Sequence, residues 1–128
     1  MKRPCHIPRY TFTVIVTAVI LYLTLFPRPL PANAMRWFAG ADKAVHALMF
    51  LAWAFAAVVD TCRGRKKELH TKRALVCFAA TMAFGGSIEI AQTLMQMGRS
   101  GDWWDLVADA IGAIVGTIIG RIVLVRKQ

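Results

Sequence analysis

The sequence predicts an all-α membrane protein that crosses the bilayer four times, and three observations support this prediction. Apolar residues make up 57% of the 128 residues, whereas ordinary globular chains contain about 45–50%. The excess is concentrated in four continuous blocks, separated by short charged or proline-rich stretches. Apolar and polar residues do not alternate within these blocks, and lipid admits only helices or closed barrels. We therefore expect a four-transmembrane-helix bundle that forms a single domain over residues 1–128.

The four expected helices cover residues of about 10–26, 43–59, 74–97 and 105–125. The first block, YTFTVIVTAVILYLTLF, contains no charge, and its length is close to the lower limit of about 17–25 residues for a spanning helix. Pro27, Pro29 and Pro31 follow the block and prevent the helix from continuing.

A cleaved signal peptide is the alternative interpretation of this first block. Basic residues precede it, and Ala32-Asn33-Ala34 resembles a cleavage site. The apolar run is longer than the usual apolar region of about 7–15 residues in a signal peptide. A retained helix is therefore favoured.

The distribution of Lys and Arg predicts the orientation of the helices. Cytoplasmic segments of membrane proteins carry an excess of these residues. The N-terminus, the loop between the second and third helices, and the C-terminal end are strongly basic, whereas the other two loops contain fewer basic residues. Both termini are therefore expected in the cytoplasm. This topology accounts for the net charge of +9. Because no basic patch with interleaved aromatic residues is present, nucleic acid is not an expected partner.

Polar residues interrupt the last three blocks at helical spacing, and this topology places them toward the outer leaflet. Residues three or four apart share one face of a helix, so the polar residues form one stripe on each helix. Arg99 lies on the turn between the last two helices. The candidate pocket residues are Asp42, Lys43, His46, Glu89, Gln92, Arg99, Asp102, Asp105 and Asp109.

Burial of these acids in lipid requires that they be paired. An Asp at a helix centre costs about 2.5–3.5 kcal/mol on insertion scales. The cost falls if the three stripes face one another and the acids lie beside Lys43, His46 and Arg99. We therefore predict a polar pocket between the last three helices, open to the outer face. The alternative is a polar cluster that only fastens the helices together.

The last block also contains glycines at intervals of four residues, Gly112, Gly116 and Gly120. This spacing allows another helix backbone to approach closely. Packing within one bundle is the favoured interpretation, and a homo-oligomer is the alternative.

The segments DKAVHALMFLAWA and EIAQTLMQMGRSGDWWDLVADAIGAIVG together resemble the pattern of VanZ-like membrane proteins. That pattern has Asp-Lys-x-x-His at the start of one helix, Glu-x-x-Gln in the next, then an Arg, a cluster of Asp and a glycine-rich final helix. The resemblance covers the chain from Asp42 to Gly120. One departure is Ala110-Ile111 before Gly112, where many relatives place an Asn directly before that glycine.

The resemblance implies a role in the bacterial cell envelope and a location in the cytoplasmic (inner) membrane. The namesake of the family confers low-level resistance to the lipoglycopeptide teicoplanin, and no molecular activity is established for it. We therefore expect the outward pocket to handle an envelope component. A lipid headgroup or a lipid-linked wall precursor would suit Lys43, His46 and Arg99, and membrane lipids are the expected partners.

An inert scaffold, whose basic loop from Arg63 to Arg73 would hold anionic lipid or a partner, stays open as a function. Two further functions also stay open at this stage. One is a membrane hydrolase or transferase, with His46 as base or nucleophile and Asp109 orienting it, although no Ser or Cys lies among the pocket residues. The other is a small proton-coupled transporter with Glu89 as the proton carrier. No reaction and no cofactor are assigned. No metal site is assigned either, because one His among carboxylates is a weak signal that suits hard ions as well as zinc.

Overall fold

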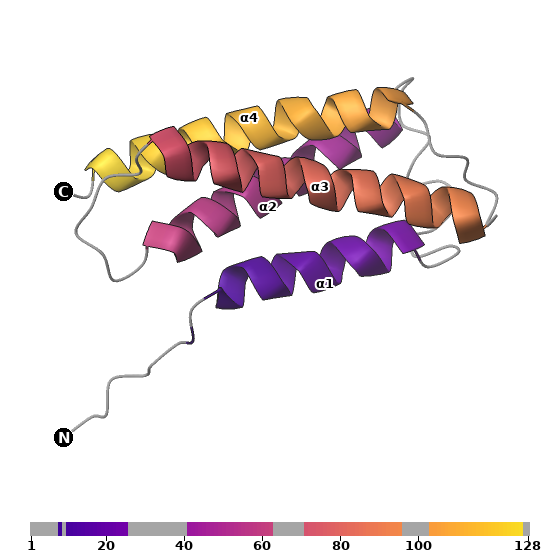
Figure 1. Cartoon of the computed structure of the whole chain (residues 1–128), viewed down its shortest axis with the longest axis horizontal. Coiled ribbons are helices and arrows are strands. Elements are labelled where there is room, and N and C mark those ends of the chain that lie inside the picture. Colours follow the sequence, from indigo (N-terminus) through magenta and orange to yellow (C-terminus); the bar gives the residue numbers. More distant parts are fainter. Residues whose placement is uncertain (1–7, 9, 26–40, 63–70, 96–102, 127–128) are drawn as a thin grey trace.

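The structure is a computed structural model that describes residues 8, 10–25, 41–62, 71–95 and 103–126, and its regular structure is entirely α-helical. Its four helices are α1 (Thr11–Leu25), α2 (Ala41–Cys62), α3 (Thr71–Met95) and α4 (Trp103–Arg126). Successive helices run in alternate directions, as Figure 1 shows. The starts of α2 and α4 therefore lie beside the end of α3. The predicted all-α class with four helices is confirmed.

Two helices extend beyond the apolar blocks from which they were predicted. The second helix continues through Asp60 to Cys62, and the third begins at Thr71, before its apolar run. Hydropathy marks the part of a helix that suits lipid, whereas backbone hydrogen bonds continue into polar residues as long as nothing interrupts them.

Three of the helices, α2, α3 and α4, are long and apolar enough to cross a membrane. The first helix is apolar but has only 15 residues. Many large apolar side chains point outward from the bundle, including Leu75, Ile90, Leu94 and Ile118. An outer surface of this kind is suited to lipid rather than to water.

Helices α2 and α4 make the most extensive contact in the bundle, because glycines on α4 lie directly against the backbone of α2. A Cβ atom added to Gly112 would lie 2.1 Å from the Ala47 carbonyl oxygen, and one added to Gly116 would lie 2.3 Å from that of Leu51. No side chain fits at those distances. The third glycine, Gly120, faces the side chain of Val58, which also belongs to α2.

The first helix packs on α2 and α3 and makes no contact with α4 among the described residues. Its buried Ile20 joins Phe50 and Ile88 in one apolar cluster. Next to this cluster, the Trp53 indole stacks on Phe84 with ring centroids 5.3 Å apart. The Trp53 Nε1–H also donates a hydrogen bond of 2.8 Å to Thr17 Oγ1 on α1. Aromatic and apolar side chains thus fill the middle of the bundle between α1, α2 and α3.

Candidate functional site

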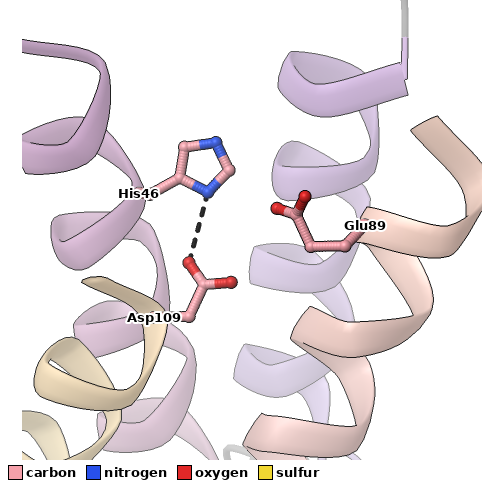
Figure 2. Close-up of side chains that lie close together, drawn as sticks. All are labelled: His46, Glu89 and Asp109. Atoms are coloured by element: carbon pink, nitrogen blue, oxygen red, sulfur yellow. Dashed lines mark hydrogen bonds and ion pairs between the residues drawn. The ribbon is translucent and has the colours of Figure 1, made fainter. Parts of the chain in front are cut away.

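The centre of the candidate site is a buried pair formed by His46 of α2 and Asp109 of α4. Nδ1 of His46 lies 3.2 Å from Oδ1 of Asp109, and the two residues are only 4% and 1% exposed. Figure 2 shows the imidazole and the carboxylate facing each other. The close approach of α2 and α4 at Gly112, one turn beyond Asp109, makes this contact between side chains from two helices short.

Glu89 completes the centre from α3. Its carboxylate points toward the His46–Asp109 pair in Figure 2. One ligand atom from each of the three residues lies within 4.8 Å of the others, so the group has the residue types and the proximity to hold a metal ion. We call His46, Glu89 and Asp109 the three-residue centre.

Space for the Asp109 carboxylate depends on Gly85 of α3. A Cβ atom at this position would lie 2.9 Å from Asp109 Oδ2 and 3.3 Å from Cε1 of Phe50. Oδ2 itself is buried and accepts no hydrogen bond from the residues that the structure describes. A buried carboxylate oxygen without a donor is costly, so a positively charged ligand beside this atom would be favourable.

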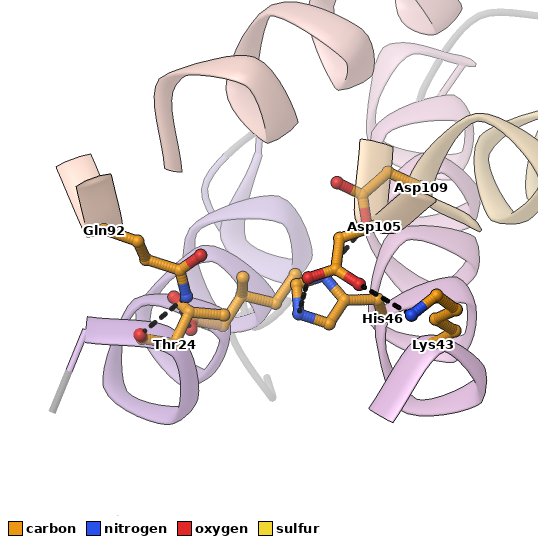
Figure 3. A network of polar contacts seen from close by, with 7 residues as sticks. Thr24, Lys43, His46, Gln92, Asp105 and Asp109 are labelled. Carbon is orange, nitrogen blue, oxygen red and sulfur yellow. Dashed lines mark hydrogen bonds and ion pairs between the residues drawn. The ribbon is translucent and has the colours of Figure 1, made fainter. Parts of the chain in front are cut away.

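A third carboxylate, that of Asp105 on α4, lies on the other side of the His46 ring. Its Oδ2 is 4.0 Å from His46 Nε2, and its Oδ1 is 4.0 Å from Nζ of Lys43. Figure 3 shows this chain of contacts from Lys43 through Asp105 to the ring. The Lys43 side chain is 44% exposed. Lys43 and Asp105 thus form an ion pair at the edge of the site, and Glu89 and Asp109 are the other carboxylates of the site among the described residues.

The other predicted pocket residues do not all join this group. Gln92 is buried, but its Nε2 donates a hydrogen bond of 3.0 Å to the backbone carbonyl of Thr24 (Figure 3). It therefore fastens the end of α1 to α3. Arg99 and Asp102 lie outside the described residues, and Asp42 is placed only as part of the first turn of α2.

A groove of about 380 Å³ runs between α3 and α4 and reaches the three-residue centre at Glu89. Apart from Glu89 and Thr93, its wall is apolar. The lining residues are Gly86, Glu89, Ile90, Thr93, Leu94, Trp103 and Leu106. Trp103 is 82% exposed at the start of α4, and exposed tryptophans of this kind are typical of the membrane–water interface. Sequence reasoning did not find the groove, because it depends on the relative rotation of two helices.

Asp60 is not among the pocket residues predicted from the sequence, but the structure gives it a clear role. This aspartate is completely buried near the end of α2. Its Oδ2 accepts hydrogen bonds of 2.8 Å from both the backbone N–H and the hydroxyl of Thr13. It therefore satisfies an amide in the first turn of α1, where negative charge is favourable. Only its position, an acid next to the end of an apolar block, could have drawn attention to it.

The arrangement as a whole defines a class of protein: a helical membrane protein with an acid–histidine site buried between its helices. The family model described as VanZ/LLP1 matches residues 12–124, and the chain belongs to this family. The resemblance found in the sequence is thereby confirmed. Among curated proteins and among solved structures, no match to the chain was found.

Proposed function

We propose that this VanZ/LLP1 protein binds an amphiphilic component of the bacterial envelope, with the polar head at the three-residue centre and an apolar chain in the groove. The observation that carries the proposal is the position of Glu89. This residue belongs both to the wall of the apolar groove and to the centre with His46 and Asp109. A ligand that fills the groove thus brings its polar end to buried titratable groups.

The proposed orientation places this site toward the outer face of the cytoplasmic membrane. It is supported by the Lys and Arg residues of the N-terminus, of the loop after α2 and of the C-terminal end. Helices in alternate directions then place His46, Glu89 and Asp109 at the opposite end from these segments. Lipid headgroups and lipid-linked wall precursors are both available there, and an effect on sensitivity to teicoplanin would follow if the ligand were a wall precursor.

A phosphate-bearing head fits the cation that the described residues place at the entrance, Lys43. The ammonium group of Lys43 is partly exposed and lies at the edge of the site. An ammonium group binds phosphate as a point charge. The apolar wall of the groove, from Ile90 to Leu106, would cover the first part of the hydrocarbon chain.

Lipid retention measured by native mass spectrometry tests this function. The purified chain is exposed to a polyprenyl phosphate, to phosphatidic acid and to the uncharged polyprenol. The wild type is expected to retain one phosphate lipid in preference to polyprenol, and Lys43→Ala should lose that preference because it removes the ammonium group at the edge of the site. The preferred lipid separates a wall precursor from a glycerolipid headgroup.

The groove itself is tested with a matched pair of variants on α3. A Cβ atom at Gly86 would meet nothing within 4 Å, so Gly86→Leu fills the groove without a clash against the backbone. Ala79→Leu adds a side chain to an exposed position outside the groove. Only Gly86→Leu should reduce retention of every lipid. Equal retention by all variants would remove the basis for the proposal.

A membrane hydrolase is the second candidate, and the His46–Asp109 contact of 3.2 Å favours it. A histidine held by a carboxylate is suited to act as a general base. Release of inorganic phosphate from the retained lipid, lost in His46→Gln, would favour hydrolysis over binding alone. A proton-coupled transporter would need further proton carriers between the centre and the other side of the membrane. The stretch of α2 from Phe50 to Val58 contains only apolar residues and therefore supplies none.

A further inference from the structure

We infer that His46, Glu89 and Asp109 form a binding site for one divalent transition-metal ion, with Zn²⁺ as the reference ion. The inference rests on the three-residue centre alone and does not require that the proposed envelope lipid be the ligand. Each of the three helices with the length to cross a membrane contributes one ligand, so the ion would join α2, α3 and α4 at one point.

The distances are close to those that a single ion requires. Zinc–nitrogen and zinc–oxygen bonds are about 2.0–2.2 Å long, so two ligands of one ion lie no more than ~4.4 Å apart. The ligand atoms of the centre lie within 4.8 Å of one another. His46 and Asp109 are already at 3.2 Å, and the flexible side chain of Glu89 can close the remaining gap by a change of rotamer.

A second and independent observation is the Asp109 Oδ2 atom. The Asp109 side chain is 1% exposed, and this oxygen has no hydrogen-bond donor among the described residues. Gly85 leaves the space around it open, since a Cβ atom there would lie 2.9 Å away. A metal ion shared with Glu89 would supply the positive partner that a buried carboxylate oxygen needs.

The charge of a divalent ion also suits the ligands. Among the described residues, Lys43 forms an ion pair with Asp105, and Glu89 and Asp109 are the two carboxylates that would share the ion with the imidazole. Two like charges in an apolar surrounding repel each other and lose their hydration. One ion of charge +2 neutralises both. The competing arrangement has a proton on His46 and another on Glu89, and the test below separates the two.

The imidazole selects the type of ion. Imidazole suits Zn²⁺ and neighbouring transition metals, whereas Mg²⁺ and Ca²⁺ prefer sites made only of oxygen ligands. Three protein ligands leave a fourth position on zinc open, and Glu89 places that side of the centre next to the groove. A phosphate or a water molecule would fit there.

Asp105 has a positioning role in this site. If Nδ1 of His46 binds the ion, Nε2 carries the proton, and Asp105 Oδ2, 4.0 Å away, comes within hydrogen-bond distance of it after a small side-chain movement. A carboxylate behind a ligating histidine fixes its tautomer, and loss of such a partner typically costs about 10–100-fold in metal affinity. Asp105→Asn should therefore weaken zinc binding within this range and leave the stoichiometry at one.

Zinc titration of the purified full chain, after treatment with EDTA, tests the inference. Isothermal calorimetry should show one Zn²⁺ per chain, Zn²⁺ should raise the melting temperature, and Mg²⁺ should do neither. Co²⁺ in place of Zn²⁺ should give visible absorption bands. Glu89→Gln and Asp109→Asn should weaken zinc binding by more than ~100-fold, because loss of a ligand exceeds loss of an outer partner.

The matched control is Asp60→Asn. Asp60 is a buried aspartate near the end of α2, far from the three-residue centre. The variant should bind zinc as the wild type does. A folded wild type that binds no zinc would overturn the inference and favour the protonated arrangement. So would zinc affinity that Glu89→Gln leaves unchanged, because the ion would then lie elsewhere. Both results leave the lipid proposal intact, since lipid retention by the EDTA-treated chain is measured separately.

Discussion

Two buried aspartates, at opposite ends of the bundle, have the same side chain and almost the same burial but different surroundings. Asp60 is 0% and Asp109 is 1% exposed. The Oδ2 atom of Asp60 receives two short hydrogen bonds from Thr13. The Oδ2 atom of Asp109 receives none from the described residues, and its Oδ1 faces a titratable ring, that of His46.

The difference separates an aspartate that fastens from one that is placed to bind. Asp60 uses its charge to hold the first turn of α1, where the backbone N–H and the hydroxyl of Thr13 both donate to its Oδ2 atom. Asp109 has neighbours that are themselves ionisable, and Gly85 keeps space beside it. Burial alone therefore does not distinguish the two aspartates, and each also has one buried oxygen without a hydrogen bond from the described residues. The titratable neighbours of Asp109 are the difference between them.

The largest expected effect comes from Gly112→Ala. This substitution should disrupt helix packing at the end of the bundle that contains Asp109 and leave the packing at the end with Asp60 unchanged. The new Cβ would lie 2.1 Å from a backbone atom of α2, so the two helices must separate. Overpacking usually costs about 1–3 kcal/mol and sometimes more, and contact with backbone belongs at the upper end. We expect a loss of at least about 3 kcal/mol in the free energy of unfolding in mixed micelles.

Hydrogen–deuterium exchange locates the damage in this variant. Protection should fall first around His46 and Asp109, while the first turn of α1 stays protected. Equal loss of protection at both ends would contradict the separation drawn between them.

Asp60→Ala should have the next largest effect, of about 2 kcal/mol, because it removes two hydrogen bonds of about 1 kcal/mol each. The same unfolding titration measures it. The effect should be local to α1, and lipid retention should remain. Thr13→Val removes only the hydroxyl donor and should cost about half as much. An Asp60→Ala variant as stable as the wild type would show that this contact does not hold α1.

Neighbouring glycines of α3 provide a smaller and more specific test. Gly86→Ala should stabilise the chain by about 0.5–1 kcal/mol, since alanine favours the helix and meets nothing there. Gly85→Ala has the same advantage, but it displaces the Asp109 carboxylate and the Phe50 ring. Its net effect should be a loss of about 1 kcal/mol. Identical unfolding free energies for the two variants would mean that the space beside Asp109 is not required.

Asp109→Asn should change stability least, by less than about 1 kcal/mol, because it keeps the shape and removes a buried charge. Zinc binding should nevertheless be lost. Affinity for zinc is the measurement, with unfolding in micelles as the control for folding. A variant that is strongly destabilised would place Asp109 with Asp60 as a fastening residue.

Much of the fold could be read from the sequence because hydropathy is a local property. The four apolar blocks correspond to α1–α4, and the helix ends differ from the prediction by at most three residues. Where α2 runs past its apolar block, it carries Asp60 into the bundle. The contact with Thr13, 47 positions away in the chain, cannot be recognised from residues near either partner.

The candidate site could be predicted only as a set of helix faces. Helical spacing placed His46 on one helix, Glu89 on the next and Asp109 on the last, and the structure brings these three together. Gln92 shares a stripe with Glu89, but its amide reaches Thr24 instead. A single turn of α3 therefore contributes one residue to the centre and one to the packing of α1.

The sequence by itself determined the class of the protein, the number of helices and the end of the bundle at which the acids gather. Composition and spacing act within one helix, and they are sufficient for these properties. Only the tertiary structure decided which acids lie beside His46, which buried oxygen atoms have no hydrogen bond and where the groove lies. The reason is that the rotation of each helix about its axis is set by contacts between helices, above all by the glycines of α4 against the backbone of α2.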